Sequence, residues 1–191
     1  MKRMELLFAC LAALFFAVPA FAEAASDEVA FQFTLPGVRV PDNPNVGGIR
    51  FSLLHGINTN MSGFDLGLIS LSESENRSGL AVIMGVSKTT GRSSGLNSGL
   101  IVLHDGEATG VNMSFINRIA TLSSGANIGF LNITESYSSV DIGGMAISDR
   151  SNVQIGFVNI TKRIEGFQIG FLNIAENGFL PVFPLFNFPK K

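Results

Sequence analysis

The sequence predicts an all-β fold, a repeat-built antiparallel meander of about ten strands that closes into a β-barrel, and three observations support this prediction. A short unit recurs from Gly48 to the end of the chain. Within each unit the residue types alternate with a period of two, as expected for a β-strand whose successive side chains point to opposite faces. Each alternating stretch is followed by polar turn residues.

The repeat has a consistent internal pattern when each unit is numbered from its opening residue. Five units begin at residues 63, 95, 125, 152 and 166, and looser copies begin at residues 48, 79, 110, 139 and 178. Positions 2, 4 and 6 form an almost unbroken apolar face, position 5 is mostly glycine, and positions 7 and 9 are again apolar. Position 3 is mostly polar and supplies the candidate polar-face residues: Asp65, Asn97, Asn112, Asn127, Asp141, Gln154 and Gln168.

Separate elements are expected at the two ends of this repeat region. Residues 29–35 alternate like a strand and stop at Pro36 and Gly37, and residues 41–45 form a turn into the next strand, residues 48–54. The last unit contains Pro181 and Pro184, which cannot donate hydrogen bonds to a β-ladder. We therefore expect residues 179–188 to be an edge or terminating segment.

A β-solenoid is the alternative architecture. A solenoid stacks identical positions on one another, which would explain the amides at position 3 and at position 8, the latter being Asn117, Asn132, Asn159 and Asn173. A solenoid would also need inward apolar residues from the return path of each coil, and here that path is mostly Ser, Thr, Glu, Asn and Lys. The turns of a meander vary freely, so the meander is favoured.

The dimensions of the unit fit a barrel in an outer membrane. Ten residues at about 3.3 Å each give a strand of roughly 33 Å, which at a tilt of about 40° rises about 25 Å, the height of the apolar band. The even face would contact outer-membrane lipid, a candidate partner, and the polar face would line a lumen. Trp is absent and Tyr137 is the only tyrosine, so aromatic girdles would consist of Phe alone. Apolar positions 7 and 9 also argue against a water-filled pore.

The N-terminus reads as a signal peptide for export, residues 1–22, followed by a single β-repeat domain, residues 23–191. Lys2 and Arg3 precede an apolar stretch, which ends at an Ala-Phe-Ala cleavage site. Cleavage would remove Cys10, the only cysteine, and would change the formal net charge from −2 to −3. A weakly acidic domain without a basic cluster argues against nucleic acid as a partner.

Chemistry-bearing motifs are scarce, so we expect neither catalytic activity nor a cofactor or metal. His55 and His104 are the only histidines, and without a metal-binding spacing we interpret both as solvated turn residues. Asp65 and Asp141 share one repeat position and could meet across a lumen. The other interpretation is that each replaces the amide found in other units and forms hydrogen bonds in a polar layer.

The later units carry a family resemblance. Residues 166–174 read Gly-Phe-Gln-Ile-Gly-Phe-Leu-Asn-Ile, and residues 178–187 close the repeats with a Phe- and Pro-rich variant. This pattern resembles the bacterial surface-repeat family of exported proteins, which implies a β-rich protein of the cell envelope or surface and no known activity. The predicted function is therefore a structural outer-membrane or surface-associated β-barrel. The alternative is a soluble periplasmic or surface repeat module that binds a protein, a glycan or an apolar ligand.

Overall fold

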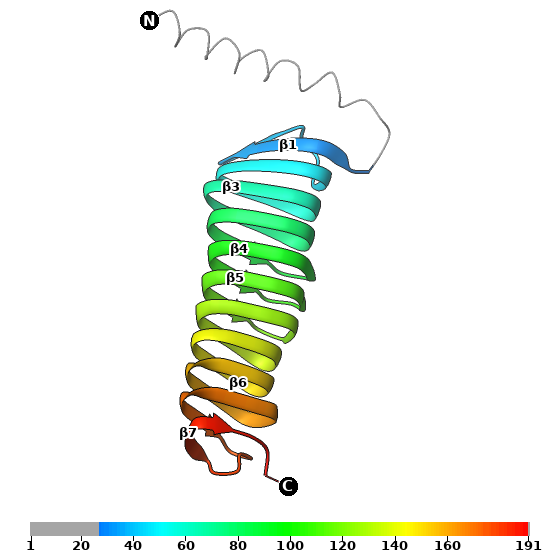
Figure 1. Cartoon of the computed structure of the whole chain (residues 1–191). Coiled ribbons are helices and arrows are strands. Elements are labelled where there is room, and N and C mark those ends of the chain that lie inside the picture. Colours follow the sequence, from blue (N-terminus) through cyan, green and yellow to red (C-terminus); the bar gives the residue numbers. More distant parts are fainter. Residues whose placement is uncertain (1–26, 191) are drawn as a thin grey trace, which may run out of the picture.

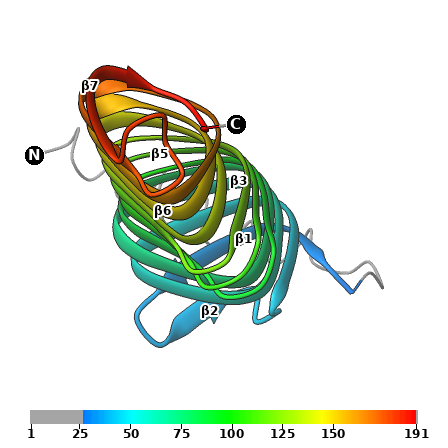
Figure 2. The same cartoon turned by 90° about the horizontal axis from the view of Figure 1, so that it is seen from below.

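A computed structural model describes residues 27–190, and the predicted signal peptide lies outside these residues. The described chain is all-β and forms an elongated stack of coils (Figure 1). Its elements are β1 (Val29–Leu35), β2 (Val38–Val40), β3 (Asn45–Thr89), β4 (Ser93–His104), β5 (Ala108–Ile119), β6 (Leu122–Ala175) and β7 (Val182–Asn187). Viewed from below, the coils lie over one another (Figure 2).

The predicted antiparallel meander and its closure into a barrel are wrong, because the repeats pair in parallel. β3 pairs with β4, β4 with β5 and β5 with β6 in the parallel sense, and equal repeat positions are partners. Gly79 thus pairs with Gly95, Gly95 with Gly110, and Gly110 with Gly125. Each repeat unit is one coil of a β-solenoid rather than one strand of a meander. The structural outer-membrane barrel predicted as the function is contradicted together with this architecture.

The interior of the solenoid is mixed and not purely apolar. Met61, Ile83 and Ile119 are buried among many buried amides, hydroxyl groups and charged groups, which is why the expectation of an apolar interior misled the choice of architecture. Inward residues on the return path include Ser72, Ser87 and Thr89, none of which is more than 1% exposed. These hydroxyl-bearing side chains point inward at positions where apolar residues were expected. The even positions point outward instead, as Phe130 and Phe157 show, with exposed fractions of 61% and 63%. The solenoid thus buries many more polar side chains, and exposes more large apolar ones, than an ordinary globular protein does.

Glycine at position 1 allows the coils to approach closely at one corner. Gly95 has a φ of +99°, in the left-handed region that favours glycine. A Cβ atom added there would lie 2.1 Å from the carbonyl oxygen of Gly79 in the preceding coil. Gly110 repeats this geometry against Gly95, with a φ of +109°. The recurring opening glycine of the sequence unit is thus explained by backbone conformation and by coil-to-coil contact.

Antiparallel strands close both ends of the parallel stack. β1 coincides with the predicted strand and pairs in parallel with β3, while β2 pairs with β1 in the antiparallel sense. At the other end β7 pairs antiparallel with β6 and is last in the sheet order, which confirms the predicted terminating segment. Such terminal strands cover backbone groups that an open edge would offer to another chain.

Candidate functional site

The seven predicted polar-face residues lie inside the solenoid, where none is more than 2% exposed. Four of them form a hydrogen-bonded ladder across successive coils: Asn97 donates to Asn112 over 3.3 Å, Asn112 to Asn127 over 2.9 Å, and Asn127 to Asp141 over 2.8 Å. Gln168 donates to Gln154 over 2.7 Å in the coils that follow. An amide both donates and accepts, so one residue type can repeat in register and form hydrogen bonds from coil to coil, although Asn97 Oδ1 and Gln168 Oε1 have no partner among residues 27–190. These side chains build an interior and not an accessible surface.

A second amide column follows position 8 of the repeat. Asn117 donates to Asn132, and Asn159 to Asn173, each over 2.8 Å. The same amide groups also reach backbone carbonyl oxygens, as Asn132 does at Ile142 over 3.1 Å. The recurrence of Asn at position 8 was the sequence signal for this column, and stacking in a solenoid is its physical cause.

A buried cluster of charged residues occupies the interior near the N-terminal end. Arg50 forms a bidentate pair with Asp65, at 2.9 Å from Nε to Oδ1 and 2.6 Å from Nη2 to Oδ2. Arg77 lies 3.2 Å from the same carboxylate, and Ser72 donates to it over 2.9 Å. Burial alone would raise the pKa of Asp65, but the two guanidinium groups and these hydrogen bonds lower it below its usual value. Burial also lowers the pKa of Arg77 to about 10.

The interpretation of both histidines as solvated turn residues is wrong for His104. Its side chain is fully buried, and its Nε2 lies 2.9 Å from Oδ1 of Asn112. Burial lowers the pKa of His104 to about 4, so the ring is neutral at pH 7. His55 is half-buried, with Nε2 3.4 Å from the Glu73 carboxylate. The two histidines therefore share no site.

Asp65 and Asp141 do not meet. Asp141 ends the Asn ladder and accepts hydrogen bonds from Asn127 over 2.8 Å and from Ser138 over 2.7 Å. Burial raises the pKa of Asp141, and these hydrogen bonds only partly offset the effect. The second interpretation of the sequence, replacement of an amide within a polar layer, describes Asp141. Asp65 instead balances the buried arginines, which no sequence motif indicated.

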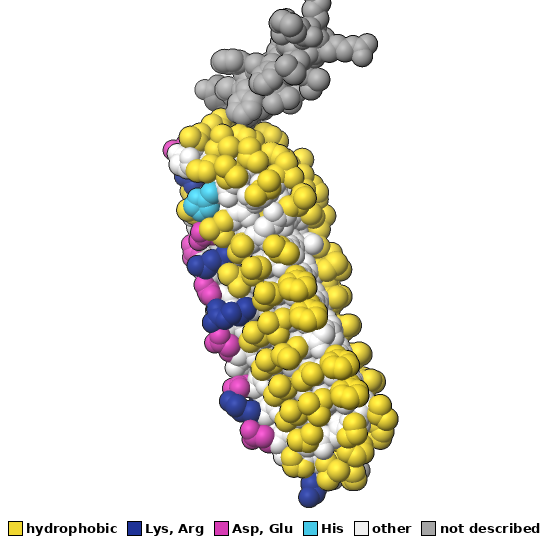
Figure 3. Space-filling model, turned by 90° about the vertical axis from the view of Figure 1, so that its left-hand side faces the viewer, with side chains coloured by type: hydrophobic (Ala, Val, Ile, Leu, Met, Phe, Trp, Pro, Cys, Tyr) yellow, Lys and Arg dark blue, Asp and Glu magenta, His cyan; other side chains and the backbone are white. Residues whose placement is uncertain are grey.

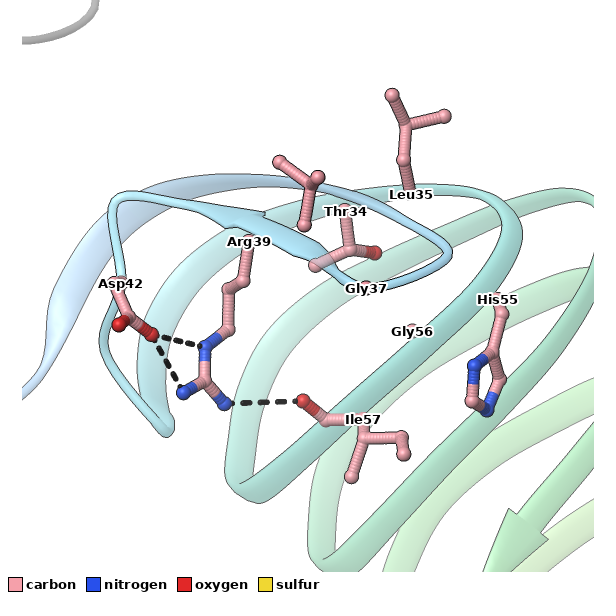
Figure 4. A pocket seen from close by; sticks show the side chains of 9 residues that line it. Thr34, Leu35, Gly37, Arg39, Asp42, His55, Gly56 and Ile57 are labelled. Carbon is pink, nitrogen blue, oxygen red and sulfur yellow. Dashed lines mark hydrogen bonds and ion pairs between the residues drawn. The ribbon is translucent and has the colours of Figure 1, made fainter.

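A surface hollow of about 390 Å³ lies between the β1–β2 hairpin and β3 (Figure 4). Arg39 is the cation on its wall, but its guanidinium is held by Asp42 over 3.0 and 2.7 Å and also donates to the Ile57 carbonyl oxygen over 3.3 Å. Those donors have protein partners and do not point to an anionic ligand. Among residues 27–190, no group of three or more His, Cys, Asp and Glu side chains could hold a metal ion.

A row of large exposed apolar side chains, which we name the apolar ridge, follows position 6 of the coils and position 7 in the coil of Ile69. Two pairs of its phenylalanines stack in parallel with ring centroids 5.0 Å apart, Phe115 on Phe130 and Phe157 on Phe171. Apolar side chains cover this view of the rod along its length (Figure 3). The ridge consists of Ile69, Met84, Leu100, Phe115, Phe130, Phe157 and Phe171, which are 53–75% exposed.

Charged side chains are gathered along another edge of the rod, visible as a stripe in Figure 3. Residues of opposite sign pair between neighbouring coils along this charged edge. Lys88 Nζ lies 3.9 Å from Asp105, Arg118 contacts both Asp105 and Glu135, and Lys162 Nζ lies 2.7 Å from Asp149. In-register stacking would bring like charges together if every coil carried the same residue, so the alternation of sign stabilises the stack. We define the charged edge as Lys88, Asp105, Arg118, Glu135, Asp149 and Lys162.

No helix in the described part of the chain is long and apolar enough to cross a membrane. Comparisons with protein-family models, with curated proteins and with solved structures found no match.

Proposed function

We propose that this chain is a non-catalytic β-solenoid module that acts by binding an apolar partner along the apolar ridge. One observation carries the proposal: the fold places many amides and hydroxyl groups inside and leaves a row of phenylalanines and other large apolar side chains exposed to water. Phe130, Phe157 and Phe171 are 61–66% exposed and belong to one row, which Gly144 interrupts between Phe130 and Phe157. Isolated exposed apolar residues are common on proteins, but a contiguous apolar surface of this extent is typical of an interaction site.

The binding free energy that the ridge can supply is estimated from its exposed apolar surface area. Covering the exposed part of one ridge phenylalanine removes on the order of 100 Å² of apolar surface from water, which corresponds to about 2–3 kcal/mol. A partner that covers several of these rings would gain a free energy well above that of a single contact, before the cost of association. The ridge can therefore support specific binding without contributions from charged groups.

The distribution of reactive groups supports a non-catalytic role. The carboxylates of Asp65 and Asp141 and the imidazole of His104 are buried and hydrogen-bonded within the solenoid. The exposed charges of the charged edge pair with one another between coils. Binding would use the exposed apolar side chains of the ridge. Catalysis would need the carboxylates and the imidazole, which are buried inside the solenoid. Export to the cell envelope, as the N-terminal sequence predicts, belongs to this proposal, and cell fractionation would test it.

The experiment is retention on a phenyl or octyl matrix in a falling salt gradient. The test variant carries Phe130→Gln, Phe157→Gln and Phe171→Gln on the ridge, and a matched control carries Glu135→Gln, Asp149→Gln and Lys162→Gln on the charged edge. We expect the ridge variant to elute much earlier than the parent and the control to elute at or later than the parent. Equal retention of the ridge variant and the parent, with far-UV circular dichroism unchanged, would overturn the proposal.

A further inference from the structure

We infer that the apolar partner is a second copy of this chain, and that two copies pack face to face through the sheet that carries the apolar ridge. This inference rests on the proposed function and names its partner. The surface concerned is the outward side of positions 2, 4 and 6, which we name the apolar face, and the ridge is one border of it. The area and the regular spacing of this face favour a second copy.

The apolar face is three side chains wide and runs over seven coils. These coils open at residues 79, 95, 110, 125, 139, 152 and 166. Apolar side chains follow the rod along its length in Figure 3. The surface is thus a broad side of the sheet and not a single line of residues. Its two end coils are apolar and exposed at all three positions: Leu80, Val82 and Met84 at 36–65%, and Phe167, Ile169 and Phe171 at 42–66%.

The area of the apolar face matches the requirement of a stable dimer. Three side chains that are each about half exposed offer on the order of 200 Å² per coil. Smaller residues at Ser98, Ala126 and Gly144 reduce the total, yet seven coils still provide about 1,000 Å². A standard interface takes about 800 Å² from each partner, whereas the largest apolar patch of a typical monomer covers about 300–600 Å². The face therefore exceeds what a monomer usually exposes and suffices for a dimer.

The side chains of the face are spaced at a repeat that a second copy shares. The coils pair in register, so Leu80 lies beside Leu96, Leu96 beside Val111, and Val111 beside Ala126. Paired strands are about 4.8 Å apart, so the face presents rows at this spacing along the rod. Rows of one copy can therefore seat between rows of the other at every coil, as in a dry steric zipper, with the two sheets about 10 Å apart.

Neither acyl chains nor an unrelated globular protein offers this repeat. Acyl chains would remove the same area from water, but a fluid medium does not give the close contacts of two matched surfaces. An ordinary twisted sheet would lose register with the rows after a few strands. The rings of the face are already ordered, since Phe115 stacks on Phe130 and Phe157 on Phe171 with interplanar angles of 5° and 4°. Such preordered side chains lose little freedom against a rigid partner.

Charged residues lie at the margin of the apolar face and are paired within the chain. Arg92 Nε lies 3.5 Å from Glu107, and Arg150 Nε lies 3.4 Å from Glu165, just before the coils enter the face. An apolar centre with a polar rim is the usual anatomy of a protein interface. Because each rim charge has a partner of opposite sign in its own chain, two copies can meet without like-charge repulsion.

Sedimentation velocity without lipid or detergent tests the inference on the chain purified from expressing cells. We expect the mass of a dimer at about 10 μM. Ile142→Lys with Ile155→Lys places charges on the apolar face, and each occurs twice in a two-fold dimer, so the dissociation constant should rise at least about a hundredfold. The matched control, Ile147→Lys with Ile160→Lys, changes the same coils at position 9, beyond the ridge, and should remain a dimer. Far-UV circular dichroism checks that both variants fold.

Tryptophan fluorescence gives a second measurement that does not depend on the folding of the Lys variants. The chain contains no tryptophan, so a single introduced Trp reports its own surroundings. Ile155→Trp on the apolar face should emit at shorter wavelength in the dimer and shift to longer wavelength on dilution. Ile160→Trp, beyond the ridge, should show no dependence on protein concentration.

The possible results separate a second copy from other partners. A parent chain that is monomeric at about 50 μM would overturn the inference. Dissociation by the control pair but not by the pair on the face would also overturn it, and so would masses that grow beyond the dimer with concentration. A monomer whose Ile155→Trp emission shifts only when phosphatidylcholine vesicles are added would overturn it in favour of lipid.

The proposed function is tested separately, because the dimer and the phenyl matrix use the same surface. The matrix comparison is repeated in the Ile142→Lys, Ile155→Lys background, where the ridge is open, with and without the three Phe→Gln substitutions. Earlier elution of the chain with these substitutions supports the proposed function even if the parent is a monomer. Equal retention in this background would overturn the proposed function itself.

Discussion

Asp65 and Asp141 occupy the same position of the repeat and are equally buried, yet their pKa values move in opposite directions. Near Asp65 the preceding coil supplies Arg50 and the return path of its own coil supplies Arg77, and these guanidinium groups favour the charged carboxylate. Asp141 is surrounded by neutral groups, Asn127 in the preceding coil and Ser138 three residues earlier, so burial dominates and favours the protonated form. The charge state of an interior residue in a solenoid is thus decided by the groups that its own coil and the adjacent coil place around it.

The interior around Asp65 and the interior from Asn97 onward also stabilise the stack of coils by different kinds of contact. The N-terminal interior depends on a few strong charged contacts, whereas the interior from Asn97 onward depends on many equivalent amide contacts. Removal of one partner from a buried ion pair leaves an uncompensated charge, which is costly. The loss of one amide contact is a smaller and more local event.

The largest expected effect is that of Asp65→Asn. This change leaves Arg50 and Arg77 buried without a counter-charge, and we expect the free energy of unfolding at pH 7 to fall by about 3–5 kcal/mol. Urea denaturation monitored by circular dichroism measures this free energy of unfolding. Asp42→Asn, which removes an exposed pair with Arg39, serves as the control and should cost less than about 1 kcal/mol. Similar losses for both variants would contradict the role assigned to Asp65.

The next effect is a loss of stability on acidification that comes from His104. Its pKa is about 4 in the folded protein and about 6.5 when unfolded, so between these values the unfolded chain binds the additional proton. The contribution of His104 to the free energy of unfolding should therefore fall by about 3 kcal/mol as the pH decreases from 7 to 4. Protonation of Asp141, whose pKa is raised, adds stability as the pH falls, so the His104 effect is measured in an Asp141→Asn background. Protonation of Asp65 adds its loss only at lower pH, because its folded pKa lies below the usual value. Urea titrations at several pH values check this, and His104→Gln should flatten the profile between pH 7 and 4.

A gain in stability is expected for Asp141→Asn. The raised pKa of Asp141 means that the folded state loses stability as the pH rises above the unfolded value of about 3.9. The variant removes that charge and continues the Asn ladder, so we expect the free energy of unfolding at pH 7 to rise by about 1–2 kcal/mol. Thermal unfolding at pH 7 measures the change, and Asp149→Asn on the charged edge is the exposed control. A less stable Asp141→Asn variant at pH 7 would show that the neighbouring coils favour the ionised carboxylate.

The smallest effect concerns the corner at Ile69. A β-branched residue at a φ of 45° is strained, and Asn adopts this region more readily. Ile69→Asn should raise the free energy of unfolding by about 1 kcal/mol, measured by urea denaturation. Leu100→Asn replaces a ridge residue of ordinary φ and should change stability by less than about 0.5 kcal/mol. If the two variants behave alike, strain at the corner is not significant.

Much of the local structure could be predicted from the sequence. The strand at residues 29–35 and the terminating segment near the C-terminus are where the alternation and the prolines indicated, and the amides at positions 3 and 8 do stack. Position 6 points outward, as expected for the apolar face of positions 2, 4 and 6, whereas position 8 turns inward: Phe130 is exposed and Asn132 is buried. These features depend on the period of two and on the chemistry of single residues.

The architecture could not be predicted, because the period of two is the same in a meander and in a solenoid. The decision depended on an assumption that an interior must be apolar, which Ser87 and Asn132 contradict. The contacts of Arg77 and His104 were missed for a related reason. Both residues stand in segments that read as polar turns, and only in-register stacking places them inside the coils.

The central claim is that amides lie inside and phenylalanines outside, and cysteine labelling tests it most directly. Cys10 is the only cysteine, so Cys10→Ser provides a background for Phe130→Cys and Asn132→Cys, two positions apart in one coil. With a bulky, water-soluble maleimide, and with Ile142→Lys and Ile155→Lys added to keep the apolar face open, we predict rapid labelling of Phe130→Cys and slow labelling of Asn132→Cys until urea unfolds the chain. Faster labelling of Asn132→Cys than of Phe130→Cys in the folded protein would contradict the account.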